Sequence, residues 1–164
     1  MMFGPLDTQR CYRALLVAMA RPGTVHGVEP GLPLVLATLV DHEVTLAEPG
    51  DPHWDRADFV LVRSGDSHGE LIRVRHGTLL DPALGATAIY EIEAVGTGPL
   101  ALSLTGPGVG PVPRHLRLAG VAGPEVALWQ VTRSGYPCGV DLILVDRAGH
   151  CAALPRSTAL ERVA

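Results

Sequence analysis

The sequence predicts an α/β fold in which a mixed sheet and a few helices form a layered sandwich. Its 164 residues are 47% hydrophobic with a mean hydropathy of +0.24, which suits one compact core and not two. Segments with helical spacing of apolar residues alternate with short apolar runs typical of strands. The 19 glycines and 14 prolines fall between these segments, so they indicate turns and not disorder. We therefore predict that residues 1–164 form a single domain.

The first predicted element is a helix over residues 9–20. Its apolar side chains recur at helical spacing, at Tyr12, Leu15, Leu16 and Met19. Asp7 or Thr8 is the expected N-cap, and Pro22-Gly23 ends the helix because proline cannot continue it. A second helix is predicted over residues 32–41.

The middle of the chain is predicted to be rich in strands. Each apolar run there is bounded by Gly, Pro or Asp, and the runs cover residues 43–47, 58–64, 86–95, 100–104 and 115–120. A third helix follows over residues 124–135, and Trp129 in it is expected to be a core or interface aromatic. A buried strand over 139–146 and a shorter partner over 151–155 complete the sheet.

Composition and charge exclude several classes of function. The net charge is −4, and the 13 positive side chains, all arginines, are scattered along the chain. This pattern gives no electrostatic footprint for nucleic acid or for an anionic membrane surface. Because lysine is absent, the chain cannot form a Schiff base with pyridoxal phosphate or use a phosphate-loop lysine. We expect no cofactor.

The three cysteines point to a reducing compartment. Cys11, Cys138 and Cys151 are odd in number and widely spaced, so they form neither a disulfide framework nor a zinc ribbon. The apolar run at residues 14–20 is too short for a secretory or membrane-spanning segment. We expect a soluble, cytoplasmic protein.

One short stretch matches the nucleophile motif of serine hydrolases. Gly65 to Gly69 reads G-x-S-x-G around Ser67, with Asp141 and His150 following in the required order. A helix should follow such a serine, but residues 70–77 alternate apolar and polar side chains as a strand does. We therefore predict a turn between two strands, and the hydrolase interpretation is an outlier.

Two acidic turns resemble metal sites without having the required spacing. Residues 51–55 and 66–70 each contain one histidine between acidic side chains, but neither brings two imidazoles to one face. Both are predicted to be solvated turns. No metal ligand and no catalytic residue is assigned.

Three charged residues are candidates for binding an anion or for lying at an interface. Arg21 before Pro22 and Arg156 after Pro155 each have a fixed backbone direction, so each could present its guanidinium to a phosphate or a carboxylate. Asp141 interrupts an apolar run, and a buried carboxylate is costly unless it is paired. We predict that Asp141 pairs with an arginine or with backbone N–H groups, and Arg156 is the candidate partner.

The glycine-rich stretch at residues 103–111 is either a phosphate cradle or a turn. Gly106 and Gly108 flank Pro107, which has no N–H to offer a phosphate, and the lysine of a phosphate loop is missing. A rigid turn at the end of a strand, with positive φ or a close backbone approach, fits these residues better. The alternative is an anion site formed by this loop with Arg21 and Arg156.

Six short motifs together resemble the H subunit of the bacterial carbon–phosphorus lyase complex. They occur in the family's order, as AMARPG (18–23), LVD (39–41), GTLLDP and GAT (77–87), LTGPGV (104–109), YPCGVDLILV (136–145) and ALPRST (153–158). No single motif is specific, but the match runs through most of the chain. The sequence departs from the family pattern at Tyr136 and Cys138, where a phenylalanine and a bulkier apolar residue are expected.

The resemblance implies a largely architectural, accessory role in phosphonate utilisation. It implies assembly with the G, I and J subunits of the complex, and a homodimer when the chain is isolated. The complex joins a phosphonate to an ATP-derived ribose triphosphate and later cleaves the carbon–phosphorus bond in another subunit. The fold implied is similar to the large domain of pyridoxal-phosphate aminotransferases, without the cofactor. An independent ligand-binding subunit is the alternative.

Overall fold

The computed structural model describes residues 2–163 and contains two sheets and three α-helices. Six strands form the larger sheet in the order β1-β8-β7-β4-β3-β2, and three form the smaller one in the order β6-β5-β9. Strands β2, β3, β4 and β7 run parallel, β8 is antiparallel to β7, and β1 is antiparallel to β8. The predicted α/β class with a mixed sheet is confirmed.

The bounds of the elements are as follows. The helices are α1 (Pro5–Ala20), α2 (Leu32–Leu39) and α3 (Glu125–Val131), with 3-10 turns η1 (Trp54–Arg56), η2 (Glu70–Arg73) and η3 (Pro82–Leu84). The strands are β1 (His26–Gly27), β2 (Leu46–Ala47), β3 (Phe59–Arg63), β4 (Thr87–Ile92), β5 (Ala94–Thr105), β6 (Arg114–Ala119), β7 (Asp141–Asp146), β8 (His150–Leu154) and β9 (Ala159–Arg162).

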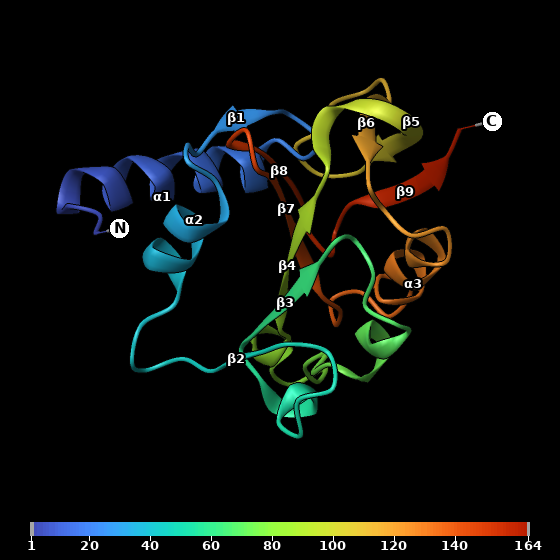
Figure 1. Cartoon of the computed structure of the whole chain (residues 1–164). Helices are drawn as coiled ribbons and strands as arrows, with labels where there is room; N and C mark the ends of the chain where they lie inside the picture. Colours follow the sequence, from blue (N-terminus) through green and yellow to red (C-terminus); the bar gives the residue numbers. More distant parts are fainter. Residues whose placement is uncertain (1, 164) are drawn as a thin grey trace.

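Figure 1 shows the larger sheet with α1 and α2 to its left and α3 with the smaller sheet to its right. One apolar cluster lies on each side of the larger sheet. Alternate residues of each central strand point to opposite faces. On β4, for example, Ile89 packs with α1 and α2, while Ala88 and Tyr90 pack on the side of α3. The near-continuous apolar run at residues 142–145 reflects this burial on both faces.

Each of the three predicted helices is present, but their bounds differ: α2 ends two residues and α3 four residues before the predicted ends, and α1 is shifted at its start. Helix α1 begins one turn earlier than expected, with Gly4 as N-cap and Pro5 at the first helical position. Asp7 is therefore inside the helix, and its carboxylate accepts a hydrogen bond from the Gly4 N–H at 2.9 Å. Proline suits the first turn because its missing N–H would have no partner there.

Three strand predictions are corrected. Residues 70–77 form no strand; Leu71 and Val74 are buried three residues apart around η2, while Ile72 is exposed. Only Leu46–Ala47 of the predicted run 43–47 pairs with a neighbour. The runs 86–95 and 100–104 are divided differently, because β5 begins at Ala94 and continues to Thr105 through an irregularity between Val95 and Leu100. Strands β1 and β9 were not predicted.

Candidate functional site

Asp141 and Arg156 form the predicted pair at the amino edge of the parallel strands. Asp141 begins β7, and Arg156 lies between β8 and β9. The Arg156 Nη2 is 3.0 Å from Asp141 Oδ2, while its Nε and its backbone N–H donate to Oδ1 at 3.2 and 2.7 Å. The side chains are 14% and 22% exposed, so the pair is only partly buried. The third guanidinium nitrogen of Arg156, Nη1, donates to the Pro82 carbonyl at 2.6 Å.

This pair forms part of a wide hollow of about 500 Å³. The other side chains around it include Pro82, Tyr136, Pro137 and Ser157. Each guanidinium nitrogen of Arg156 already donates to an acceptor within the chain. The geometry therefore acts as a clamp that joins β7, η3 and the segment before β9.

The glycine stretch forms a turn, as predicted. The Val109 N–H donates to the Gly106 carbonyl at 3.1 Å, with Pro107 and Gly108 at the two central positions. Gly108 has φ of +81°, which favours glycine in the third position of a type II turn. A Cβ on Gly108 would overlap the Ala20 carbonyl, and one on Gly106 would lie 2.8 Å from the Ser157 carbonyl. The turn therefore lies between the end of α1 and the residue after Arg156.

Arg114 holds this turn to the end of α1, and sequence reasoning missed it. Its Nη1 donates to the Pro22 carbonyl at 2.5 Å, and its Nη2 to the Val109 carbonyl at 3.3 Å. Arg21 itself is an exposed C-cap residue, and none of the ion pairs among residues 2–163 includes it. The turn thus contacts the backbone of Ala20 and Ser157, which are the chain neighbours of the two candidate arginines Arg21 and Arg156. The Arg156 guanidinium itself is engaged with Asp141.

Ser67 is not an exposed nucleophile. It is fully buried, and its hydroxyl donates to Glu125 Oε1 at 2.8 Å, while the Tyr90 hydroxyl donates to Glu125 Oε2 at 2.6 Å. Burial, and secondly the charge of Glu125, raises the pKa of Tyr90. His150 bonds to Asp146 and not to Asp141, so the three residues of the hydrolase motif do not meet. The hydrolase interpretation is wrong, because this buried serine joins the turn before η2 to the start of α3 and meets neither Asp141 nor His150.

Trp129 is a core residue, as expected. Its ring is buried and packs edge-on against Tyr90, with 5.3 Å between the ring centroids. Two residues after the end of α3, Arg133 is buried and donates to the carbonyls of Trp129 and Leu154 at 2.8 and 2.6 Å. Burial lowers the pKa of Arg133 to about 10. These contacts fix the last turn of α3 to the end of β8.

The candidate metal turns are organised by their own aspartates. The Asp51 carboxylate accepts the His53 N–H at 2.8 Å, and the Asp66 carboxylate accepts the His68 N–H at 2.7 Å. His53 and His68 are both exposed. Among residues 2–163, no group of three or more His, Cys, Asp or Glu side chains is placed to hold a metal ion.

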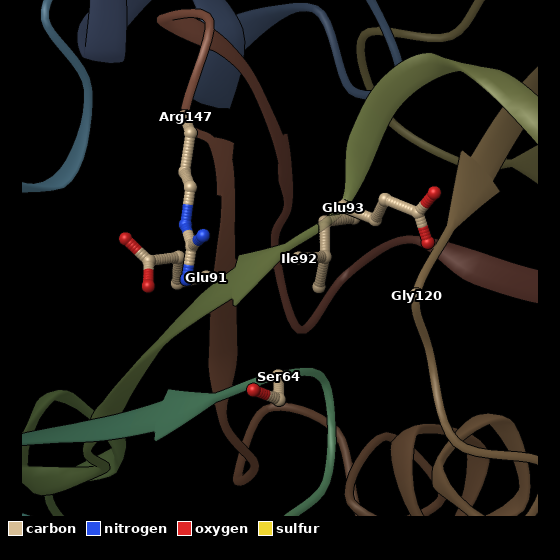
Figure 2. A pocket seen from close by; sticks show the side chains of 6 residues that line it. All are labelled: Ser64, Glu91, Ile92, Glu93, Gly120 and Arg147. Carbon is tan, nitrogen blue, oxygen red and sulfur yellow. The ribbon is translucent and has the colours of Figure 1, made fainter.

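A cleft of about 360 Å³ lies at the opposite, carboxyl edge of the parallel strands. Ser64 follows β3, Glu91 and Glu93 lie at the end of β4, and Arg147 follows β7. Figure 2 shows Arg147 and Glu91 on one side of the cleft, with Glu93 directed toward Gly120 on the other. Carboxyl ends of parallel strands often carry ligand sites, but the sequence analysis did not predict this cleft. These residues are far apart in the sequence, so the cleft can be recognised only once β7 is known to lie beside β4.

Asp146, at the end of β7 beside this cleft, is a buried carboxylate that joins the two sheets. It accepts hydrogen bonds from the N–H groups of Val95 and His150, both at 2.9 Å. Burial alone would raise the pKa of Asp146, but these bonds and the His150 ring together lower it. The carboxylate therefore stays ionised and fixes the start of β5.

In the part of the chain described, residues 2–163, no helix is long and apolar enough to cross a membrane.

Comparison with known proteins gives one family. The model of the family described as bacterial phosphonate metabolism protein (PhnH) matches residues 4–53 and 49–161. A protein of Stutzerimonas stutzeri, named as a proposed C-P lyase subunit protein, HtxG, is 36% identical over 92% of this chain and 84% of its own. The protein of Rhizobium meliloti (strain 1021) named alpha-D-ribose 1-methylphosphonate 5-triphosphate synthase subunit PhnH is 27% identical over 95% of this chain and 91% of its own. The chain belongs to the PhnH family of bacterial phosphonate metabolism proteins.

Proposed function

We propose that this chain is an accessory, non-catalytic subunit of a carbon–phosphorus lyase complex. In this role it supports the ATP-dependent formation of ribose 1-phosphonate 5-triphosphate by the assembled complex. Family membership and the names of its two relatives support the proposal. The G, I and J subunits named by the sequence resemblance are the candidate partners.

One observation carries the accessory role. Two of the side chains that sequence analysis singled out for chemistry are engaged inside the fold, since Ser67 bonds to Glu125 and Arg156 bonds to Asp141, while Arg21 is exposed. Large apolar side chains, in contrast, are exposed on several elements, among them Leu16, Leu80 and Tyr136. A surface with engaged polar groups and exposed apolar ones suits protein contacts better than catalysis.

Further parts of the proposal concern organisation and place. One apolar cluster contains residues of both sheets, which supports a single domain over residues 1–164. Cys11, Cys138 and Cys151 are free, which fits a cytoplasmic location. The likeness to the large domain of pyridoxal-phosphate aminotransferases stays a prediction.

Co-expression with tagged candidate partners tests the accessory role. We expect the full-length chain to co-purify with the tagged G, I and J subunits in a fixed ratio and to be needed for the synthase activity of the assembly. A chain that elutes alone from all three partners, or that makes the triphosphate product by itself, contradicts the proposal.

We further propose that the isolated chain is a homodimer through the apolar groove beside α1. This groove has a volume of about 180 Å³ and is lined almost entirely by apolar side chains, Tyr12, Leu15, Leu16, Met19, Leu39, Phe59 and Ile143 among them. An isologous patch of this kind suits a two-fold interface.

Sedimentation of variants tests the dimer. Leu16→Glu, in the groove, should shift a micromolar sample toward monomer, because it places a charge in the apolar contact. Leu6→Glu on the same helix is the matched control, since Leu6 is exposed outside the groove. A wild-type monomer, or equal effects of the two substitutions, contradicts this interface.

For Arg21, Gly106, Gly108, Asp141 and Arg156 we propose a structural or interface role in preference to anion binding. The turn at Gly106 to Gly108 has Pro107 at its centre, and the guanidinium of Arg156 is engaged by Asp141 and Pro82. Calorimetric titration with ATP, and separately with methylphosphonate, should show no binding at micromolar concentration. Binding that Arg21→Ala or Arg156→Ala abolishes in a folded protein contradicts the proposal and favours the anion site.

A further inference from the structure

Two leucines form the tip of a tight turn at the amino edge of the parallel strands. Leu79 is 80% exposed and Leu80 is 100% exposed, which is unusual for adjacent large apolar residues. The flanking residues Thr78 and Asp81 exchange two backbone hydrogen bonds, each of 3.1 Å. The Asp81 N–H also lies 3.0 Å from the Thr78 hydroxyl. The turn therefore holds both leucines outward.

The base of this turn is fixed to the rest of the fold. The Ala86 N–H donates to the Arg75 carbonyl at 2.7 Å, and the Gly139 N–H donates to the His76 carbonyl at 2.9 Å. The Arg75 guanidinium donates to the Leu84 carbonyl and lies 2.7 Å from Asp58 Oδ1.

The Asp58 carboxylate also accepts the Thr45 N–H at 2.9 Å. This backbone bond, followed by that of Arg75, lowers the pKa of Asp58, so the carboxylate stays ionised and keeps its contact with Arg75 at neutral pH. The leucines are thus presented on a preorganised loop, which reduces the entropy lost on binding.

The surroundings of the turn have the character of an interface. The neighbouring hollow is bounded by Pro82 and by Tyr136, whose side chain is 62% exposed. Tyrosine is enriched at protein interfaces, and adjacent exposed leucines beside it add an apolar surface that a partner could cover. The carboxylate of Asp81 stands beside the apolar tip, is exposed, and forms no ion pair among residues 2–163.

We propose that the Leu79–Leu80 turn is the anchor by which this chain docks into an apolar pocket of a different protein subunit, with a basic side chain of that subunit facing Asp81. This proposal rests on the accessory role argued above and adds the surface that serves it. The convex apolar tip fits a concave apolar partner, and the exposed carboxylate of Asp81 is complementary to a cation at the rim of that pocket.

The shape and charge of the tip favour a different subunit over two other occupants. Two copies related by a two-fold axis through this turn would meet tip to tip and bury little of the ~800 Å² per partner that a stable interface needs. A membrane surface is disfavoured because only two apolar side chains project, Asp81 lies beside them, and the net charge is −4.

A double variant tests the anchor in the full chain. Leu79→Ser with Leu80→Ser removes the apolar tip, and both positions are so exposed that the thermal midpoint should not change. We expect its affinity for the co-expressed G, I and J subunits to fall at least about tenfold, as for the loss of a binding anchor. Leu6→Ser is the matched control, because Leu6 is an exposed leucine on α1, far from this loop in sequence, and its affinity should be unchanged.

Charge reversal at Asp81 tests the rim. Asp81→Arg should weaken the same association, with a smaller loss at high salt, because it places like charges opposite each other. The backbone bonds that close the turn do not involve its side chain.

The outcomes separate this proposal from the accessory role. If the wild-type chain fails to associate with any candidate subunit, the accessory role fails first. If the wild type associates and the double variant associates equally well, only the anchor is overturned. If the double variant loses self-association, or binds less well to phosphatidylglycerol vesicles that the wild type binds, the occupant is a second copy or a membrane, and the proposal is wrong.

Discussion

The two edges of the parallel strands organise their charged side chains differently. At the amino edge, Asp141 and Arg156 contact each other through both carboxylate oxygens, and the exposed groups nearby are Leu79 and Leu80. At the carboxyl edge, Glu93 and Arg147 line an open cleft, and neither is in an ion pair among residues 2–163. Arg156 at the amino edge is therefore engaged within the fold, although the exposed Asp81 beside the apolar tip is not. In the carboxyl-edge cleft, Glu93 and Arg147 lie outside the ion pairs of residues 2–163, while Glu91 lies 4.0 Å from Arg63.

The sheet topology alone would suggest a functional site at the carboxyl edge, and the side chains of this protein point to the other edge. In open α/β sheets the carboxyl edge commonly carries the ligand site. Here the rigid clamp and the fixed turn lie at the amino edge, which suits contact with another protein. The position of a functional surface therefore has to be argued from its side chains and not from the fold.

Gly108→Val should have the largest effect, because it breaks the support next to the amino-edge clamp. A β-branched residue at φ of +81° is strained, and its Cβ would overlap the Ala20 carbonyl. We expect a loss of at least about 3 kcal/mol in the free energy of unfolding, or failure to fold. Gly110→Val is the matched control, since Gly110 also has positive φ but nothing lies within 4 Å of its Cβ position. Urea denaturation measures both losses. Equal losses would show that backbone strain at positive φ, and not the contact with the Ala20 carbonyl, destabilises the Gly108→Val protein.

Asp146→Ala should come next and tests a buried carboxylate at the end of β7, with urea denaturation as the measurement. The substitution leaves the N–H groups of Val95 and His150 without their acceptor. The expected loss is about 3 kcal/mol, as for hydrogen bonds to a charged group.

The same residue predicts a pH dependence. The folded-state pKa of Asp146 lies below its ordinary value of 3.8, so its stabilising effect is present above that value and disappears as the pH falls through the folded-state pKa. The free energy of unfolding of the wild type should therefore fall as the pH is lowered from about 5 to about 2, where carboxylates with lowered pKa values become protonated. The free energy of unfolding of Asp146→Asn should fall less over the same range. Identical acid profiles would show that Asp146 does not contribute.

Much of the amino edge could be predicted from the sequence because its signals are local. A carboxylate inside an apolar run must find a partner, which predicts the pairing of Asp141, and a proline between two glycines predicts the turn at Pro107. Helical periodicity likewise predicts α1, although its start is missed because Gly4 is the N-cap, and Asp7 supports it from the third helical position instead of being the cap itself.

The parts that could not be predicted depend on contacts between distant residues. Ser67 has a hydrolase-like motif, and only the packing of α3 shows that its hydroxyl serves Glu125. The cleft beside Arg147 exists because β7 lies next to β4, although about fifty residues separate them along the chain in a crossover of the kind that local patterns do not reveal. The exposure of Leu80 is equally hidden, since apolar residues usually indicate burial.

Arg156→Ala should have a moderate effect that measures the amino-edge clamp. It removes the contacts to Asp141 and to the Pro82 carbonyl, but the backbone N–H of residue 156 still reaches Asp141. Because the pair is only partly buried, we expect a loss of about 2 kcal/mol, below that of a fully buried pair. Asp141→Ala should lose a similar amount and should also weaken assembly. A folded, fully stable Asp141→Ala protein that assembles normally would contradict the role of the clamp.

Arg147→Ala should have the smallest effect and completes the comparison of the two edges. Arg147 is an arginine in a loop directly after a strand, as Arg156 is, but it is exposed and lies outside every ion pair among residues 2–163. Loss of such a side chain should change the free energy of unfolding by no more than about 0.5 kcal/mol. Urea denaturation of both variants under the same conditions makes the measurement. If Arg147→Ala destabilises the protein as much as Arg156→Ala does, the charges of the carboxyl edge are engaged after all, and the contrast between the two edges fails.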